Sequence, residues 1–119
     1  MRGAVLDYGC GHGYDAETYG WHRYDPHFWS VRPSILFDTI LCTYVLNVVP
    51  DKSDRSDILA DIRSMLHSHG AAYITVRNDK SKLNGWTKLG TWQGLIDLSH
   101  DYPTVLSTAG YKTYRMNCR

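Results

Sequence analysis

The chain has 119 residues, of which 43% are hydrophobic and 21% are charged, and its formal net charge is +1. This composition predicts one globular domain, residues 1–119, with a modest core, and it excludes a disordered chain. It also excludes a strong electrostatic field over the whole surface, so a nucleic-acid contact would need a local basic patch.

Membrane and metal-binding classes are disfavoured as well. No apolar run approaches the roughly 20 residues that a membrane span needs. Three cysteines without a spacing motif (Cys10, Cys42 and Cys118) argue against a disulfide framework or a zinc knuckle, and they indicate a reducing, cytoplasmic compartment. His22 and His27 lack ligand partners at suitable spacing, so we expect no metal site.

In chain order, the hydrophobic pattern predicts strands over residues 4–8, 21–24, 37–43, 71–76, 91–98 and 111–117. Short helices are expected over 16–19 and 102–109. Residues 26–36 are expected to be irregular or to form one helical turn, residues 44–50 follow the third strand up to Pro50, and residues 80–90 are expected to form a loop or loose hairpin.

The clearest helix is predicted over residues 53–68. An apolar stripe recurs with helical spacing at Ile58, Leu59, Ile62, Met65 and Leu66. Capping residues at its start are Asp51, Ser53 and Asp54; at its end, Gly70 is the expected stop, and His67 and His69 are expected to interact with the helix dipole.

The alternation of strands and helices predicts an α/β fold. Its central sheet should be mostly parallel, with right-handed crossovers. The last strand, residues 111–117, is expected to be antiparallel at or near the sheet edge.

Residues 5–13, VLDYGCGHG, form the most informative stretch. A buried strand ends in Asp7, and a turn containing Gly9, Gly11 and Gly13 follows. A second acid, Asp25, ends the next predicted strand. Ligands of open α/β sheets bind outside the carboxyl ends of the strands, where residues 42–47 and 77–79 should also lie.

The glycine spacing indicates which ligand fits. The dinucleotide pattern G-x-G-x-x-G is not met, because Tyr14 stands at its third glycine, and no Gly-Lys-Ser/Thr phosphate loop is present. An acid before the turn suits an ammonium or sulfonium group, and Asp25 suits the two hydroxyls of a ribose. The pattern therefore favours a cationic amino acid joined to a ribose.

The motifs LDYGCGHG, YDPHF (24–28) and FDTILCTYVLNVVPD (37–51) resemble those of Rossmann-like, class I methyltransferases that use S-adenosylmethionine (SAM). The similarity is greatest to a compact branch of small phage proteins and predicted methyltransferases of DNA phosphorothioation clusters. It covers residues 4–79, and residues 109–116 resemble the last turn of the superfamily. The resemblance implies SAM as methyl donor and S-adenosylhomocysteine (SAH) as product.

Carried over by position, the resemblance assigns the cofactor site. The methionine end would be held by Asp7, Tyr8, Gly9, Cys10, Gly11 and Gly13. Asp25 would bind the ribose, with Pro26 and His27 near the adenosine. The methyl group would lie beside Cys42, Thr43, Tyr44 and Asn47.

The chain departs from a typical member after the ribose acid. Only 12 positions lead from Asp25 to Phe37, so the usual further strand and helix, which help to recognise adenine, are expected to be missing. A homodimer that covers the shortened sheet would fit the same observation.

The acceptor is left open between nucleic acid and a small molecule. Weak candidates for a catalytic group are His12, Tyr44, Arg77 and Asp79. Basic and aromatic residues that nucleic acid would favour are interleaved at Arg77, Lys80, Lys82, Trp86, Lys88 and Trp92. Packing of these tryptophans on the core is the competing interpretation.

The same residues are compatible with two alternatives to a methyltransferase. A SAM-binding module without transferase activity, such as a sensor or partner subunit, would explain the missing adenine unit. A nicotinamide-dependent oxidoreductase is disfavoured by the glycine spacing.

Overall fold

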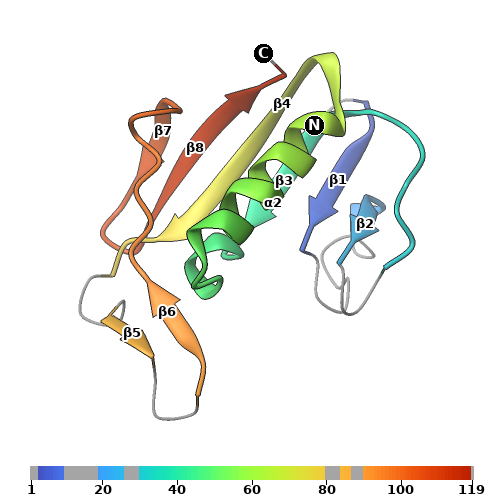
Figure 1. Ribbon diagram of the computed structural model, residues 1–119. Helices are drawn as coiled ribbons and strands as arrows, with labels where there is room; N and C mark the ends of the chain where they lie inside the picture. Colours follow the sequence, from blue (N-terminus) through green and yellow to red (C-terminus); the bar gives the residue numbers. More distant parts are fainter. Residues whose placement is uncertain (1–2, 10–18, 26–29, 80–83, 87–89, 119) are drawn as a thin grey trace.

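The computed structural model describes residues 3–9, 19–25, 30–79, 84–86 and 90–118. Six strands form one sheet in the order β2-β1-β3-β4-β8-β7 (Figure 1). These strands are β1 (Val5–Tyr8), β2 (His22–Tyr24), β3 (Phe37–Thr43), β4 (Leu66–Arg77), β7 (Thr104–Ser107) and β8 (Tyr111–Asn117). The first four are mutually parallel, and β8 runs antiparallel to both β4 and β7. The predicted α/β class with a mostly parallel sheet is confirmed.

The other elements connect or extend this sheet. A 3-10 turn, η1 (Leu46–Val48), and the helix α2 (Lys52–Ser64) link β3 to β4. A separate two-stranded hairpin, β5 (Asn84–Trp86) and β6 (Trp92–Gly94), follows β4. Within the part of the chain that the structure describes, no helix is long and apolar enough to cross a membrane.

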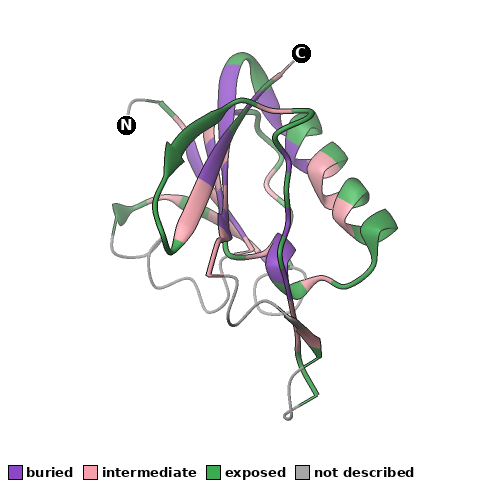
Figure 2. Cartoon of the chain, turned by 90° about the vertical axis from the view of Figure 1, so that its left-hand side faces the viewer, coloured by how far each residue is buried: buried purple, intermediate pink, exposed green. Residues whose placement is uncertain are grey.

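The hydrophobic core lies between the sheet and α2, which crosses over β3 (Figure 1). Its largest fully buried side chains include Tyr114, Phe37, Leu6, Ile40 and Ile62. Figure 2 shows the buried residues running along the central strands while the outer turns of α2 stay exposed. Because side chains alternate along a strand, Asp7 and Leu41 lie on the opposite face of the sheet from Tyr8 and Cys42.

The helix ends earlier than its apolar stripe predicts. It stops at Ser64, and Leu66 already pairs with Phe37 in β4. Gly70 is therefore not a helix stop: a Cβ there would lie 2.6 Å from the carbonyl oxygen of Phe37, so glycine permits close strand contact. The predicted dipole role of His67 and His69 is wrong, since both are exposed residues of β4.

Two predictions in the last third of the chain are also corrected. The strand predicted over 91–98 ends at Gly94, and Ile96 and Leu98 continue the alternating burial without a strand partner because they cover the core directly. The helix predicted over 102–109 is wrong. Thr104 and Val105 are β-branched and follow Pro103, and this stretch forms the edge strand β7.

The loop predictions agree with the described residues. Residues 30–36 have no helix or strand, and the stretch predicted as a loop or loose hairpin contains β5. The short helix predicted over 16–19 lies almost wholly outside the described residues.

The start of α2 gives a direct test of the local analysis. Asp51 caps it by accepting a hydrogen bond from the backbone N–H of Ser53 at 2.7 Å. Replacing Asp51 with alanine should lower the free energy of unfolding by about 1 kcal/mol, because a helix N–H loses its partner. Urea unfolding followed by circular dichroism measures this change.

The matched control is Asp57→Ala, which removes the same charge from an exposed position within the helix. Equal destabilisation by both variants would contradict the capping role.

Candidate functional site

The sheet reverses its strand order at β1. The chain runs from β1 outward to β2 on one side, and then returns to β3 on the other side. In open α/β sheets, ligands bind at this switch point, outside the carboxyl ends of the strands. The predicted ligand site therefore lies at the ends of β1 and β3.

Gly9 joins three elements at this point. Its backbone has a φ of 73°, and its N–H donates to the carbonyl of Tyr24 at the end of β2, at 2.8 Å. A Cβ on Gly9 would lie 2.5 Å from a methyl carbon of Val45, in the segment after β3. Only glycine fits both the left-handed backbone and this close approach.

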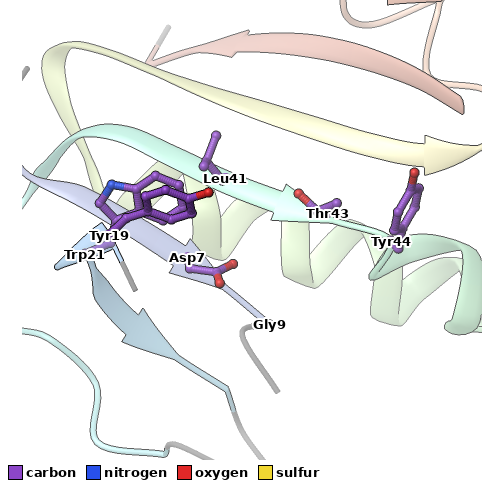
Figure 3. A pocket seen from close by; sticks show the side chains of 7 residues that line it. All are labelled: Asp7, Gly9, Tyr19, Trp21, Leu41, Thr43 and Tyr44. Carbon is purple, nitrogen blue, oxygen red and sulfur yellow. The ribbon is translucent and has the colours of Figure 1, made fainter. Parts of the chain in front are cut away.

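A first hollow, here the Asp7 hollow, opens on the face of the sheet turned away from α2 (Figure 3). It has a volume of about 460 Å³ and is lined by Asp7, Gly9, Tyr19, Trp21, Leu41, Thr43 and Tyr44. Tyr19 and Trp21 stack with ring centroids 4.7 Å apart. The hollow thus combines a carboxylate with an aromatic wall.

A second hollow, the Asp25 hollow, extends toward α2. Its volume is about 370 Å³, and its lining residues are Tyr8, Gly9, Asp25, Thr43, Tyr44, Val45, Val48, Val49 and Ile58. Asp25 is only 8% exposed. Apart from this acid, valine and isoleucine side chains make up much of the wall, which suits a flat, weakly polar group.

The two hollows share Gly9, Thr43 and Tyr44, so they adjoin across the carboxyl ends of β1 and β3, and together they are called the cleft below. Asp7 lies at one end of this cleft and Asp25 at the other. The arrangement fits an elongated ligand with a polar group at each acid.

Tyr44 forms the ridge between the hollows. It has a φ of 59°, which a tyrosine adopts at a cost, and its side chain is 45% exposed. Its N–H donates to the carbonyl of Thr75 at 2.8 Å, which holds it at the end of β3. Thr43 and Tyr44 line both hollows, and their predicted place beside the methyl group stays a prediction.

Behind the cleft, Asp61 of α2 joins three elements. The hydroxyl of Tyr8 donates to Asp61 Oδ2 at 2.7 Å, and Arg32 pairs with Oδ1 of the same carboxylate, also at 2.7 Å. The Arg32 guanidinium also lies 5.7 Å from the ring centroid of Tyr24. These contacts tie the loop after β2 to the helix.

The same contacts shift the pKa values of both Tyr8 and Asp61. Burial, followed by the hydrogen bond to Asp61, raises the pKa of the Tyr8 phenol well above its ordinary value. Burial alone would raise the pKa of Asp61, but hydrogen bonds from Arg32 and Tyr8 and the charge of Arg32 together lower it. The Tyr8 hydroxyl is thus occupied by Asp61, while its ring lines the Asp25 hollow.

Two other predicted site residues lie elsewhere. Cys42 is fully buried in the core, where burial and the nearby Asp7 raise the pKa of its thiol to about 12. Asn47 is 1% exposed and donates through Nδ2 to Oε1 of Gln93 at 2.9 Å. Neither residue is among those that line the two hollows.

The remaining predicted residues divide into two groups. Arg77 and Asp79, two of the catalytic candidates, lie at the end of β4 and not among the lining residues of either hollow. The predictions for Cys10, Gly11, His12, Gly13, Pro26, His27, Lys80, Lys82 and Lys88 lie outside the described residues.

Sequence reasoning missed the stacked pair Tyr19 and Trp21 and the contact between Arg32 and Asp61. The sequence did contain a signal for Asp61, because this acid lies next to the apolar stripe of α2. Nothing in the local pattern pointed to its partner, which is 29 positions away.

Comparison with known proteins identifies the fold. No family model and no curated protein sequence matches the chain significantly, but solved structures do. The PH0226 protein from Pyrococcus horikoshii OT3 aligns with a TM-score of 0.65 and 11% identity, over 98% of this chain and 82% of its own. DhpI, solved as a complex with SAH, aligns with a TM-score of 0.63 and 14% identity, over 94% and 74%.

A third structure is the N-methyltransferase NodS from Bradyrhizobium japonicum WM9. It aligns with a TM-score of 0.60 and 16% identity, over 95% of this chain and 85% of its own. The chain therefore has the Rossmann-like methyltransferase fold. The finer similarity to phage and phosphorothioation-associated proteins stays a prediction.

The carboxylate of Asp61 predicts how stability depends on pH. Because its pKa is lower in the folded state, its contribution is complete above the ordinary aspartate pKa of about 3.9 and is lost as pH falls through the lowered value. Asp61→Asn should therefore be less stable than wild type at pH 7, and the difference should shrink below about pH 4.

Urea unfolding at a series of pH values measures this difference. Asp57→Asn, on the exposed side of the same helix, is the matched control and should track wild type. A wild-type advantage over Asp61→Asn that is unchanged at low pH would contradict the role of the ionised carboxylate.

Proposed function

We propose that this chain is a SAM-dependent methyltransferase whose donor site is the cleft formed by the Asp7 and Asp25 hollows. The observation that carries the proposal is the placement of two acids at opposite ends of one cleft, with Gly9 between them. The solved complexes of DhpI and NodS with SAH, on the same fold, support it.

The Asp7 hollow would take the amino-acid end of the donor. The carboxylate of Asp7 can face the ammonium group of the donor. Thr43 and Tyr44, which line both hollows, would lie beside the sulfonium group.

The Asp25 hollow would take the adenosine. Asp25 can accept hydrogen bonds from both ribose hydroxyls, and a carboxylate acceptor strengthens such bonds. Val45, Val48 and Ile58 would pack against the adenine. This apolar wall on the helix side would replace the recognition that a further strand and helix beyond β2 would provide.

Bound SAM supplies a methyl group that is already activated by its positive sulfur. The chain's own contribution would be positioning, which can lower a barrier by several kcal/mol when the acceptor lone pair is held in line with the methyl group. In the transfer, the sulfur–methyl bond breaks as the acceptor–methyl bond forms, which leaves SAH. The exposed Tyr44 ring would help to orient the two reactants.

A second candidate is a SAM-binding module without transferase activity. The observation that favours it is the position of β2 at the outer edge of the sheet. Asp25, which is proposed to bind the ribose, directly follows this edge strand. Transfer of a labelled methyl group from SAM to fractionated nucleic acid, protein and small molecules distinguishes the two. Labelling of any fraction supports the enzyme, and binding without labelling supports the module.

The donor site is tested by thermal unfolding with added nucleotides. The melting temperature of wild type should rise with SAM and SAH but not with NAD, because only a ligand that binds the folded state stabilises it. Asp25→Asn should weaken SAM binding by about 10- to 100-fold, as the charged acceptor for the ribose is lost.

Asp57→Asn again serves as the matched control and should respond to SAM like wild type. No response of wild type to SAM, or an equal response to NAD, would refute the proposal.

A further inference from the structure

A third hollow, the hairpin hollow, lies between η1 and the β5–β6 hairpin. Its volume is about 370 Å³, and its lining includes Val48, Pro50, Trp86, Trp92 and Gln93. Val48 also lines the Asp25 hollow, so the hairpin hollow adjoins the proposed donor cleft.

Two indole rings form its main surface. Trp86 and Trp92 are direct cross-strand partners, so their side chains lie on the same face of the hairpin. Trp86 is 68% exposed, which packing on the core would not produce. The competing interpretation, in which both tryptophans pack on the core, thus fails for Trp86.

Trp92 is held more firmly. Its ring lies across Gly94, where a Cβ would overlap it, so glycine at this position makes room for the indole. The Arg55 guanidinium lies 5.6 Å from the centroid of the same ring, and its Nη1 donates to the carbonyls of Val49 and Pro50. The hollow therefore has one fixed indole and one exposed indole.

Gln93 adds a polar group of fixed orientation. Its Oε1 accepts from Asn47, whose side chain is almost fully buried. This hydrogen bond anchors the β5–β6 hairpin to η1. Among the described residues, Oδ1 of Asn47 is a buried side-chain atom without a hydrogen-bond partner, which costs free energy of folding. The hydrogen bond from Nδ2 of Asn47 to Gln93 must offset this cost.

We propose that the hairpin hollow binds a base of single-stranded nucleic acid, and that this nucleic acid carries the methyl acceptor. This inference rests on the proposed methyltransferase function. A base stacks on the exposed Trp86. A paired base hides both its faces, so duplexes fit poorly.

Charge supports the same class of ligand. The sequence from Arg77 to Gln93 carries four basic residues and one acid, a local balance of 4 − 1 = +3, in a chain whose net charge is +1. A phosphate backbone would be attracted to this stretch, and its affinity would fall as salt increases.

The test uses fluorescence anisotropy to measure how tightly the protein binds an end-labelled, single-stranded DNA. This DNA has ~12 nucleotides, about the site size of one small domain. Trp86→Ala should weaken this binding by about 5- to 150-fold, because stacking of one base is lost. Val105→Ala, at an exposed position on the edge strand β7, is the matched control and should bind like wild type.

SAH binding by calorimetry, on the same proteins, separates the two proposals. Trp86→Ala should bind SAH like wild type, which also shows that it folds. The inference is overturned if wild type does not bind the oligonucleotide, if Trp86→Ala binds it as tightly, or if a duplex binds as well as the single strand. Failure of wild type to bind SAH would refute the donor site instead.

Discussion

The close approach of Gly9 to Val45 is the contact on which the candidate site depends. It occurs at the switch point of the sheet, where Gly9 also donates a hydrogen bond to the end of β2. One residue thereby fixes the relative positions of three chain segments. A side chain at this place would collide with a methyl group of Val45, so Val45 or Gly9 would have to shift, and both hollows would change shape because both are lined by Gly9.

Because side chains alternate along β1, its last two residues point to opposite faces of the sheet and have different roles. Asp7 points into the hollow on the open face, while Tyr8 points toward α2, where Asp61 and Arg32 hold it in place. The first residue presents a carboxylate to the hollow, and the second fixes the strand end that carries this carboxylate. The buried Cys42 on β3 fulfils a packing role for the same reason, because its neighbours Leu41 and Thr43 face the hollow instead.

Much of the fold followed from periodicity, whereas the errors arose where a tertiary contact overrode a local pattern. The strands 4–8 and 37–43 and the cap Asp51 were predictable because short apolar runs and capping residues act locally. Leu66 continues the helical stripe of α2, but pairing with Phe37 takes it into β4. The acids at the strand ends, Asp7 and Asp25, were found from their spacing. The contact between Arg32 and Asp61 and the partnership of Asn47 with Gln93 join distant segments, and no sequence pattern contains that information.

The central claim is that one donor molecule spans both hollows. A crystal structure of the chain grown with SAH tests it most directly. We predict the amino-acid end beside Asp7, the ribose hydroxyls within hydrogen-bond distance of Asp25, and the adenine against Val45, Val48 and Ile58. SAH bound at another place, or bound in the cleft with its adenosine beside Asp7, would contradict the account.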